Sequence, residues 1–284
     1  MFREVDTRVP SAVERQVASI YLRLYPQGER VFVQRAFEWA IQFFAGEYDD
    51  YQAIDARYHD FEHTLQGTLC LACLFNGRHQ ANALPALPQR MFELGLLAIL
   101  FHDTGYLKKK DDTEGTGAKY TLVHVARSAA FAREFLSRKG YPDADTSAIQ
   151  NMIKCTGVNV DLKAIPFQSD EERLVGFALG TADLLGQMAA NDYVDKLPVL
   201  YLEFAEAARY SGEKGSRAAL FTSAEDLMRK TAAFWEGYVL PKVKNDFEGI
   251  YTFLNDPFPD GPNGYIQRIE QNMARLQQRL DAGG

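Results

Sequence analysis

Apolar residues recur at intervals of three and four along most of the chain, as they do on the buried face of an amphipathic helix. The alternation of apolar and polar residues that marks a half-buried strand is nearly absent. The pattern therefore predicts an all-α protein. Helices are expected at about residues 11–26, 28–48, 59–76, 88–103, 120–139, 144–156, 170–191, 196–210, 222–240, 242–254 and 265–281.

The breaks between these helices are short and rich in Gly, Pro and charged residues. None has the length of a linker between domains, and 284 residues fit one large domain. We therefore expect a single compact multi-helix bundle over residues 1–284. Residues 1–50 would form an N-terminal helical extension, and residues 220–284 would form C-terminal helices that pack on the core.

Composition and charge narrow the class of protein. Hydrophobic residues make up 46% of the chain and charged residues 24%, as in an ordinary folded protein. The net charge of −7 argues against a nucleic-acid polymer or an anionic membrane as a partner. No apolar run could span a membrane, and the N-terminus lacks the apolar core of a signal peptide, so we expect a cytoplasmic protein. The oligomeric state is left open.

The three cysteines do not suggest a disulfide framework or a zinc site. Cys70 and Cys73 form a CxxC pair, but they lie in an apolar segment, and no second such pair exists. We expect them to pack inside a buried helix.

Most of the histidines lie close to carboxylates in predicted helices. His59 and His63 are four residues apart, which predicts that both project from one face of a helix. Two surface histidines would show the same spacing. The residue after His59 is Asp60, where a zinc protease of the HExxH type has glutamate.

A second group of polar residues follows or interrupts apolar runs. Residues 96–101 are all apolar and are followed by His102 and Asp103, which predicts a buried helix that ends in two polar side chains. Their burial without partners would cost several kcal/mol, and a metal ion removes this cost because it binds both imidazole and carboxylate. Asp183 is the only charged residue in 174–191, although an aspartate paired with arginine or capping a helix would look the same.

The chain resembles the HD superfamily of metal-dependent phosphohydrolases in three segments, Tyr58-His59-x-x-x-His63, Leu100-Phe101-His102-Asp103 and Thr181-Ala182-Asp183. The order and setting of these segments are most similar to the subgroup that contains the class I cyclic-nucleotide phosphodiesterases. The resemblance extends from about residue 57 to 205.

This resemblance implies a hydrolase of a small phosphoester or nucleotide, in which a metal-activated water attacks phosphorus. It implies that four side chains bind the first metal: His63, His102, Asp103 and Asp183. Asp103 would also bridge to a second metal, His59 would protonate the leaving oxygen, and His124 would orient water or the substrate phosphate. The cofactor would be one or two divalent ions per chain, of Mn, Mg, Zn, Fe, Co or Ni.

The chain departs from this subgroup at positions that matter for specificity. Residues 104–107 replace a further histidine and a Pro-Gly, so the ligands of a second metal are incomplete. No glutamine lies near Trp235, where the subgroup has its purine-binding amide, and Gly157 replaces an aspartate. We therefore expect no strong preference for cyclic purine nucleotides unless Gln187 supplies the amide.

Two other functions would fit the same scaffold. A diiron oxygenase would need more histidine ligands than the three or four available here. A non-catalytic metal-binding sensor or scaffold would not need a proton donor such as His59 beside its ligands. The residues favour a phosphodiesterase or phosphomonoesterase that acts on a small phosphorylated substrate.

Overall fold

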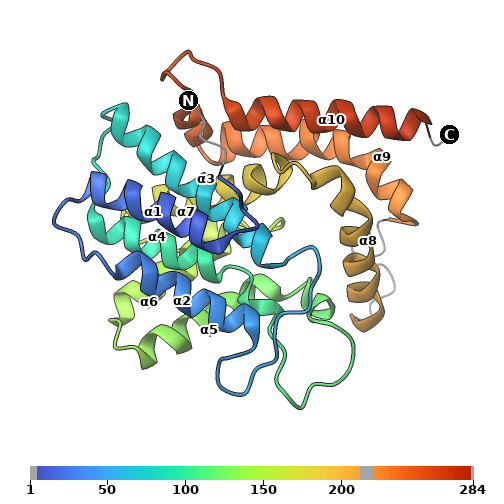
Figure 1. Ribbon diagram of the computed structural model, residues 1–284, viewed down its shortest axis with the longest axis horizontal. Coiled ribbons are helices and arrows are strands. Elements are labelled where there is room, and N and C mark those ends of the chain that lie inside the picture. Colours follow the sequence, from blue (N-terminus) through green and yellow to red (C-terminus); the bar gives the residue numbers. More distant parts are fainter. Residues whose placement is uncertain (1–4, 212–220, 283–284) are drawn as a thin grey trace.

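The computed structural model describes residues 5–211 and 221–282. Within these ranges the chain forms ten α-helices and no strand, only isolated bridges, so the predicted all-α class is confirmed (Figure 1). The helices are α1 (Pro10–Leu24), α2 (Phe32–Ala45), α3 (Phe61–Gln80), α4 (Gln89–Phe101), α5 (His124–Arg138), α6 (Asp143–Lys154), α7 (Asp170–Met188), α8 (Tyr193–Tyr210), α9 (Ala224–Phe234) and α10 (Gly264–Ala282).

The predicted helix at 242–254 is wrong as a continuous α-helix. A π-helical turn, Lys242–Asp246, is followed by a 3-10 segment, Ile250–Leu254. Between them Glu248 and Gly249 have φ angles of 56° and 70°, in the left-handed region that an α-helix cannot contain. The chain therefore turns at this point before it reaches α10.

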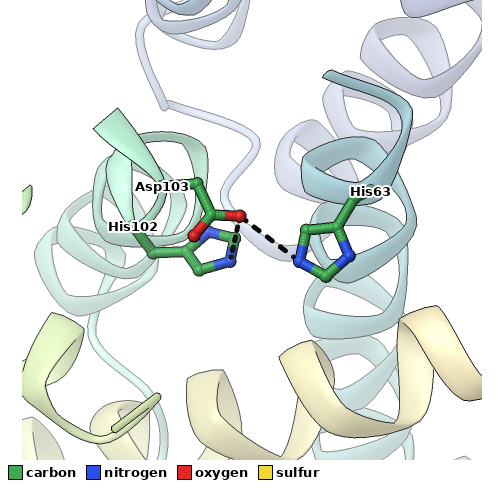
Figure 2. A group of neighbouring side chains, drawn as sticks. All are labelled: His63, His102 and Asp103. Atoms are coloured by element: carbon green, nitrogen blue, oxygen red, sulfur yellow. Dashed lines mark ion pairs between the residues drawn. The ribbon is translucent and has the colours of Figure 1, made fainter. Parts of the chain in front are cut away.

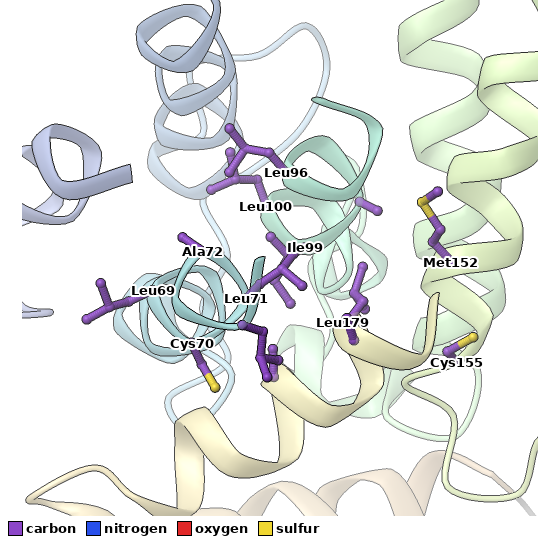
Figure 3. Close-up of a cluster of buried hydrophobic side chains, with 14 of the residues drawn as sticks. Leu69, Cys70, Leu71, Ala72, Leu96, Ile99, Leu100, Met152, Cys155 and Leu179 are labelled. Carbon is purple, nitrogen blue, oxygen red and sulfur yellow. The ribbon is translucent and has the colours of Figure 1, made fainter. Parts of the chain in front are cut away.

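The centre of the molecule is formed by α3, α4 and α7. Every residue from Phe92 to Phe101 in α4 is buried, as expected for a helix that is apolar on all sides. Figure 3 shows Leu71 of α3, Ile99 of α4 and Leu179 of α7 in one cluster of buried side chains. These three helices are the ones that carry the predicted metal ligands.

The remaining helices surround this centre. α1 packs on α3 and α2 on α4, while α5 and α6 pack together and both contact α4. α10 contacts α7, α8 and α9 and buries Tyr265, Ile269 and Leu276. Of the predicted N-terminal extension and C-terminal helices, residues 1–4, 220, 283 and 284 lie outside the described part of the chain.

The CxxC pair packs in the interior. Cys70 is buried, Cys73 is half-buried, and both thiols are free. Burial raises the pKa of the Cys70 thiol well above its ordinary value and that of Cys73 to about 11, so neither is a thiolate at neutral pH. None of the described helices combines the length and apolar character needed to cross a membrane.

Candidate metal centre

The start of α3 differs from the sequence-based expectation. The side chain of Asp60 accepts a hydrogen bond from the backbone N of His63 at 2.9 Å, so Asp60 caps the helix and α3 begins at Phe61. The prediction that His59 and His63 share one helical face is therefore wrong, because His59 lies before the cap. The two imidazole rings nevertheless meet, with centroids 5.2 Å apart.

Glycines let α3 and α7 approach each other beside the predicted ligands. A Cβ atom at Gly186 would lie 2.8 Å from the carbonyl oxygen of Gln66, which is closer than any ordinary contact. Gly186 follows Asp183 by three residues and Gln66 follows His63 by three. The crossing point of the two backbones is thus less than one helical turn from each ligand, and it brings these two side chains together.

Gly186→Ala tests the role of this crossing. Alanine favours an isolated helix by about 1 kcal/mol over glycine, but here its methyl group would push against the backbone of α3 and cost about 1–3 kcal/mol. We expect a lower melting temperature together with weaker metal binding. Gly237→Ala is the matched control, because no atom lies within 4 Å of a Cβ at that helical position. Equal melting temperatures and equal metal affinities in the two variants would contradict this explanation.

His102 and Asp103 lie directly after the last residue of α4. The Nδ1 of His102 donates to the carbonyl oxygen of Ile99 at 2.7 Å, which leaves Nε2 to face the centre. A Cβ at Gly105 would lie 2.0 Å from the carbonyl oxygen of His124. Glycine is therefore required where the turn after Asp103 touches the start of α5.

Each of the two predicted ligand imidazoles lies close to both predicted ligand carboxylates. The Nε2 of His63 lies 3.3 Å from Asp103 Oδ2 and 3.3 Å from Asp183 Oδ1. The Nε2 of His102 lies 3.3 Å and 3.5 Å from the same two oxygens. Figure 2 shows His63 on α3 facing His102 and Asp103 at the end of α4, and ligand atoms of these three residues all lie within 4.8 Å of one another.

The chemistry of this set and its imidazole–carboxylate spacings fit a metal ion, although the group whose ligand atoms all lie within 4.8 Å of one another consists of His63, His102 and Asp103 and does not include Asp183. Two atoms that are each about 2.1 Å from one ion lie about 3.0 Å apart at a right angle and about 3.4 Å apart at the tetrahedral angle. The observed nitrogen to oxygen distances of 3.3–3.5 Å lie close to this range. Moreover, His102 Nε2 and Asp103 Oδ2 are buried and make no hydrogen bond to any described residue. A cation would remove the cost of burying them.

The positive charge of His102 and the negative charges of the nearby carboxylates stabilise one another. Burial alone would lower the pKa of His102, but the carboxylates of Asp103 and Asp183 outweigh it and raise that pKa to about 9. Burial alone would raise the pKa of Asp183, but the close approach and the charge of His102 and His63 hold it far below its ordinary value. Without a metal, the pair of His102 and Asp183 is therefore charged at neutral pH.

This pairing predicts how stability depends on pH. The His102 pKa rises from an ordinary 6.5 to about 9 in the folded, metal-free protein. The stabilisation, on the order of 3 kcal/mol, is therefore complete below about pH 6.5 and disappears as the pH rises through about 9. A metal needs the neutral imidazole, so its own stabilisation grows over the same interval.

Thermal melts in EDTA and in MnCl₂ measure this directly. We expect the melting temperature in EDTA to fall as the pH rises from 6.5 to 9. Over the same interval, the increase in melting temperature caused by MnCl₂ should grow. If the difference stays constant over this interval, protons and metal do not compete at His102.

His59 is paired with a glutamate that the sequence did not single out. Its Nδ1 lies 2.5 Å from Oε2 of Glu203 on α8, and Oε1 of the same carboxylate accepts from the backbone N of Tyr58 at 2.7 Å. Burial alone would lower the pKa of His59, but the carboxylate of Glu203 reverses the effect and raises it. The sequence contained only a weak indication of this role, which is that Glu203 lies on the buried side of α8 together with Leu197 and Ala207.

His124 and Tyr106 lie next to Asp103 and His59. The Nε2 of His124 lies 3.8 Å from Asp103 Oδ1, and its Nδ1 donates to the carbonyl oxygen of Thr121 at 2.6 Å. Burial lowers the pKa of His124, so its ring is neutral at pH 7. The ring of Tyr106 lies 4.7 Å from that of His59 and 4.8 Å from that of His124. Sequence reasoning did not identify Tyr106 as part of the site.

Two further residues considered from the sequence, His79 and Gln187, have no free group at this centre. His79 is exposed in the last turn of α3. Gln187 accepts a hydrogen bond from the hydroxyl of Tyr58 at 2.8 Å and donates to Asp183 Oδ1 at 3.3 Å, so its amide is not free for a substrate.

One protein family matches a stretch of the chain that contains part of this site. The model of the Npun_R2479-like family matches residues 110–253. This stretch contains His124, Asp183 and Glu203, whereas His63 and the pair at 102–103 precede it. No curated protein matches the chain.

Proposed function

We propose that this chain, which belongs to the Npun_R2479-like family, is a metal-dependent hydrolase of a small phosphoester. The observation that carries the proposal is that each of two imidazole nitrogens lies 3.3–3.5 Å from both of two carboxylates, with buried atoms that make no hydrogen bond to the described residues. The residues that would bind the metal are His63, His102, Asp103 and Asp183.

The metal would supply two things to such a reaction, acidification of a water molecule and neutralisation of phosphate charge. The remaining groups belong to the chain. Glu203 raises the pKa of His59 and so favours the protonated ring. With Nδ1 bonded to that carboxylate, Nε2 is the nitrogen that can donate to a leaving oxygen. The two residues therefore form an acid and its positioning group.

His124 is suited to a different role. Its Nδ1 donates to Thr121, so Nε2 of the neutral ring carries the lone pair and can accept a hydrogen bond from water or from a protonated phosphate oxygen. The site opens on this side, since the side chains of His59, His124 and Asp183 are 14%, 20% and 12% exposed, while those of His102 and Asp103 are at most 2% exposed. Substrate would therefore reach the centre past the two non-ligand histidines.

Metal analysis and a substrate panel test the proposal. We expect the purified protein to contain a divalent metal, and to hydrolyse p-nitrophenyl phosphate or bis-p-nitrophenyl phosphate with Mn²⁺ or Mg²⁺. EDTA should remove this activity and the metal should restore it. A protein that binds no divalent metal, or that binds one and hydrolyses no phosphoester, would refute the hydrolase.

The same panel tests specificity. We expect less than about a hundredfold preference in kcat/KM for cyclic AMP or cyclic GMP over the chromogenic diester, equivalent to about 2.7 kcal/mol. The reason is that the amide of Gln187 is engaged by Tyr58 and Asp183, so it cannot read a purine edge without breaking those bonds. A larger preference would show that Gln187 is released on binding.

A further inference from the structure

A second pocket lies on another face of α3. It has a volume of about 620 Å³, typical of a small-molecule site, and is lined by residues of α3, the end of α7, the following segment 189–192, the start of α10 and residues 5–8. Glu62, Gln66 and Leu69 line it from α3, at the spacing of one helical face.

This pocket is separated from the metal centre. Between them is a cavity of about 10 Å³, lined by His63, Gln66 and Gln187 among others. A cavity of this volume holds about one water molecule. A phosphate at the metal centre and an organic group in the larger pocket therefore cannot belong to one molecule that passes through this gap.

Gln66 lines both cavities, and its side-chain amide is not hydrogen-bonded to another described residue. The residue is 7% exposed, yet its side chain makes no hydrogen bond to any residue in the described ranges 5–211 and 221–282. Its amide atoms are not among the fully enclosed polar atoms that lack a partner, so they face the space of the two cavities. The smaller cavity holds about one water molecule, so an organic partner for this amide can lie only in the larger pocket.

The charged groups around the pocket are paired with one another. Arg8 donates to both carboxylate oxygens of Asp6 at 2.8 Å. Arg268, the other cation that lines the pocket, lies 3.4 Å from the amide oxygen of Asn191. Lys196, which lines the small cavity, lies 2.9 Å from Asp60, 3.8 Å from Glu62 and 3.7 Å from Asp192, so it is shared by three carboxylates. Because these cations already have partners, we take hydrogen bonding as the means of recognition in this pocket.

We propose that this pocket is a second small-molecule site whose ligand is a neutral heterocycle with an adjacent hydrogen-bond donor and acceptor, as in a nucleobase, bound edge-on by the amide of Gln66. A glutamine amide donates and accepts at once, so it matches such an edge with two hydrogen bonds. The buried side of Leu69 and the ring of Tyr265 supply apolar wall.

Calorimetric titration of the full chain with uridine and adenosine tests this proposal. EDTA is present throughout, so the result does not depend on the hydrolase function. We expect one of the two nucleosides to bind with a Kd below about 1 mM and Gln66→Met to weaken it at least about tenfold, because both hydrogen bonds are lost. Gln277→Met, on the exposed side of α10, should bind as the wild type does. If uridine is the ligand, 3-methyluridine, which lacks the donor, should bind wild type as weakly as uridine binds Gln66→Met.

Thermal melts of the ligand-free proteins separate a recognition role from a structural one. Gln66→Met replaces an amide without partners by an apolar chain of similar size, so its melting temperature should equal or exceed that of the wild type. A fall of several degrees would mean that Gln66 has a structural partner and would overturn the proposal. Failure of both nucleosides to bind, or equal binding by wild type and Gln66→Met, would overturn it as well.

Discussion

Asp103→Ala is expected to abolish metal-dependent phosphoester hydrolysis and to reduce the metal content of the purified protein to background. Asp103 Oδ2 lies 3.3 Å from the imidazoles of His63 and His102, and Oδ1 is 3.8 Å from His124, so this carboxylate links the proposed metal ligands to the third histidine. Residues that merely support a ligand cost about 10–100-fold when removed, and loss of a ligand should exceed this range. Metal content and kcat/KM with added Mn²⁺ are the two measurements.

His79→Ala is the matched control. His79 is exposed at the end of α3 and lies outside the cluster, so we expect its activity and metal content to equal those of the wild type. Circular dichroism of both variants establishes that they fold. If Asp103→Ala is folded and as active as His79→Ala, the metal has no place in the mechanism.

The helices could be predicted from the chain because their stabilisation is local in sequence. The apolar residues of α4 and the single aspartate in the apolar stretch of α7 were visible as patterns, and both elements lie where they were expected. Burial also explains why His102, Asp103 and Asp183 stood out, since polar residues inside apolar runs demand partners. The error at His59 came from the same local reasoning, which missed that Asp60 would cap the helix instead of extending it.

Contacts between distant parts of the chain could not be predicted in this way. Glu203 is 144 positions from His59, and nothing in its own helix distinguishes it from Glu206, which binds Thr116 instead. Tyr106 acquires its position between two histidines only when α5 packs against the turn after Asp103. The four proposed metal ligands could be expected from buried polar residues together with the resemblance to the HD superfamily, whereas Glu203 and Tyr106 could be found only from the three-dimensional arrangement.

Glu203→Gln is expected to lower kcat by about 10–100-fold while KM and metal content stay close to those of the wild type. The amide can still accept a hydrogen bond from His59, but it lacks the negative charge that raises the pKa of that imidazole against the effect of burial. The protonated form of His59 would therefore be lost at lower pH, and the alkaline limb of the kcat profile should move to lower pH.

The control for this variant is Glu206→Gln, one turn further along α8, which loses charge on the same helix without contacting His59. Its alkaline limb should coincide with that of the wild type. A purely structural role of Glu203 would lower the melting temperature and the amount of active enzyme but leave the shape of the pH profile unchanged. Only loss of the charge beside the imidazole moves the limb, so an unmoved limb in Glu203→Gln would show that His59 is not the acid.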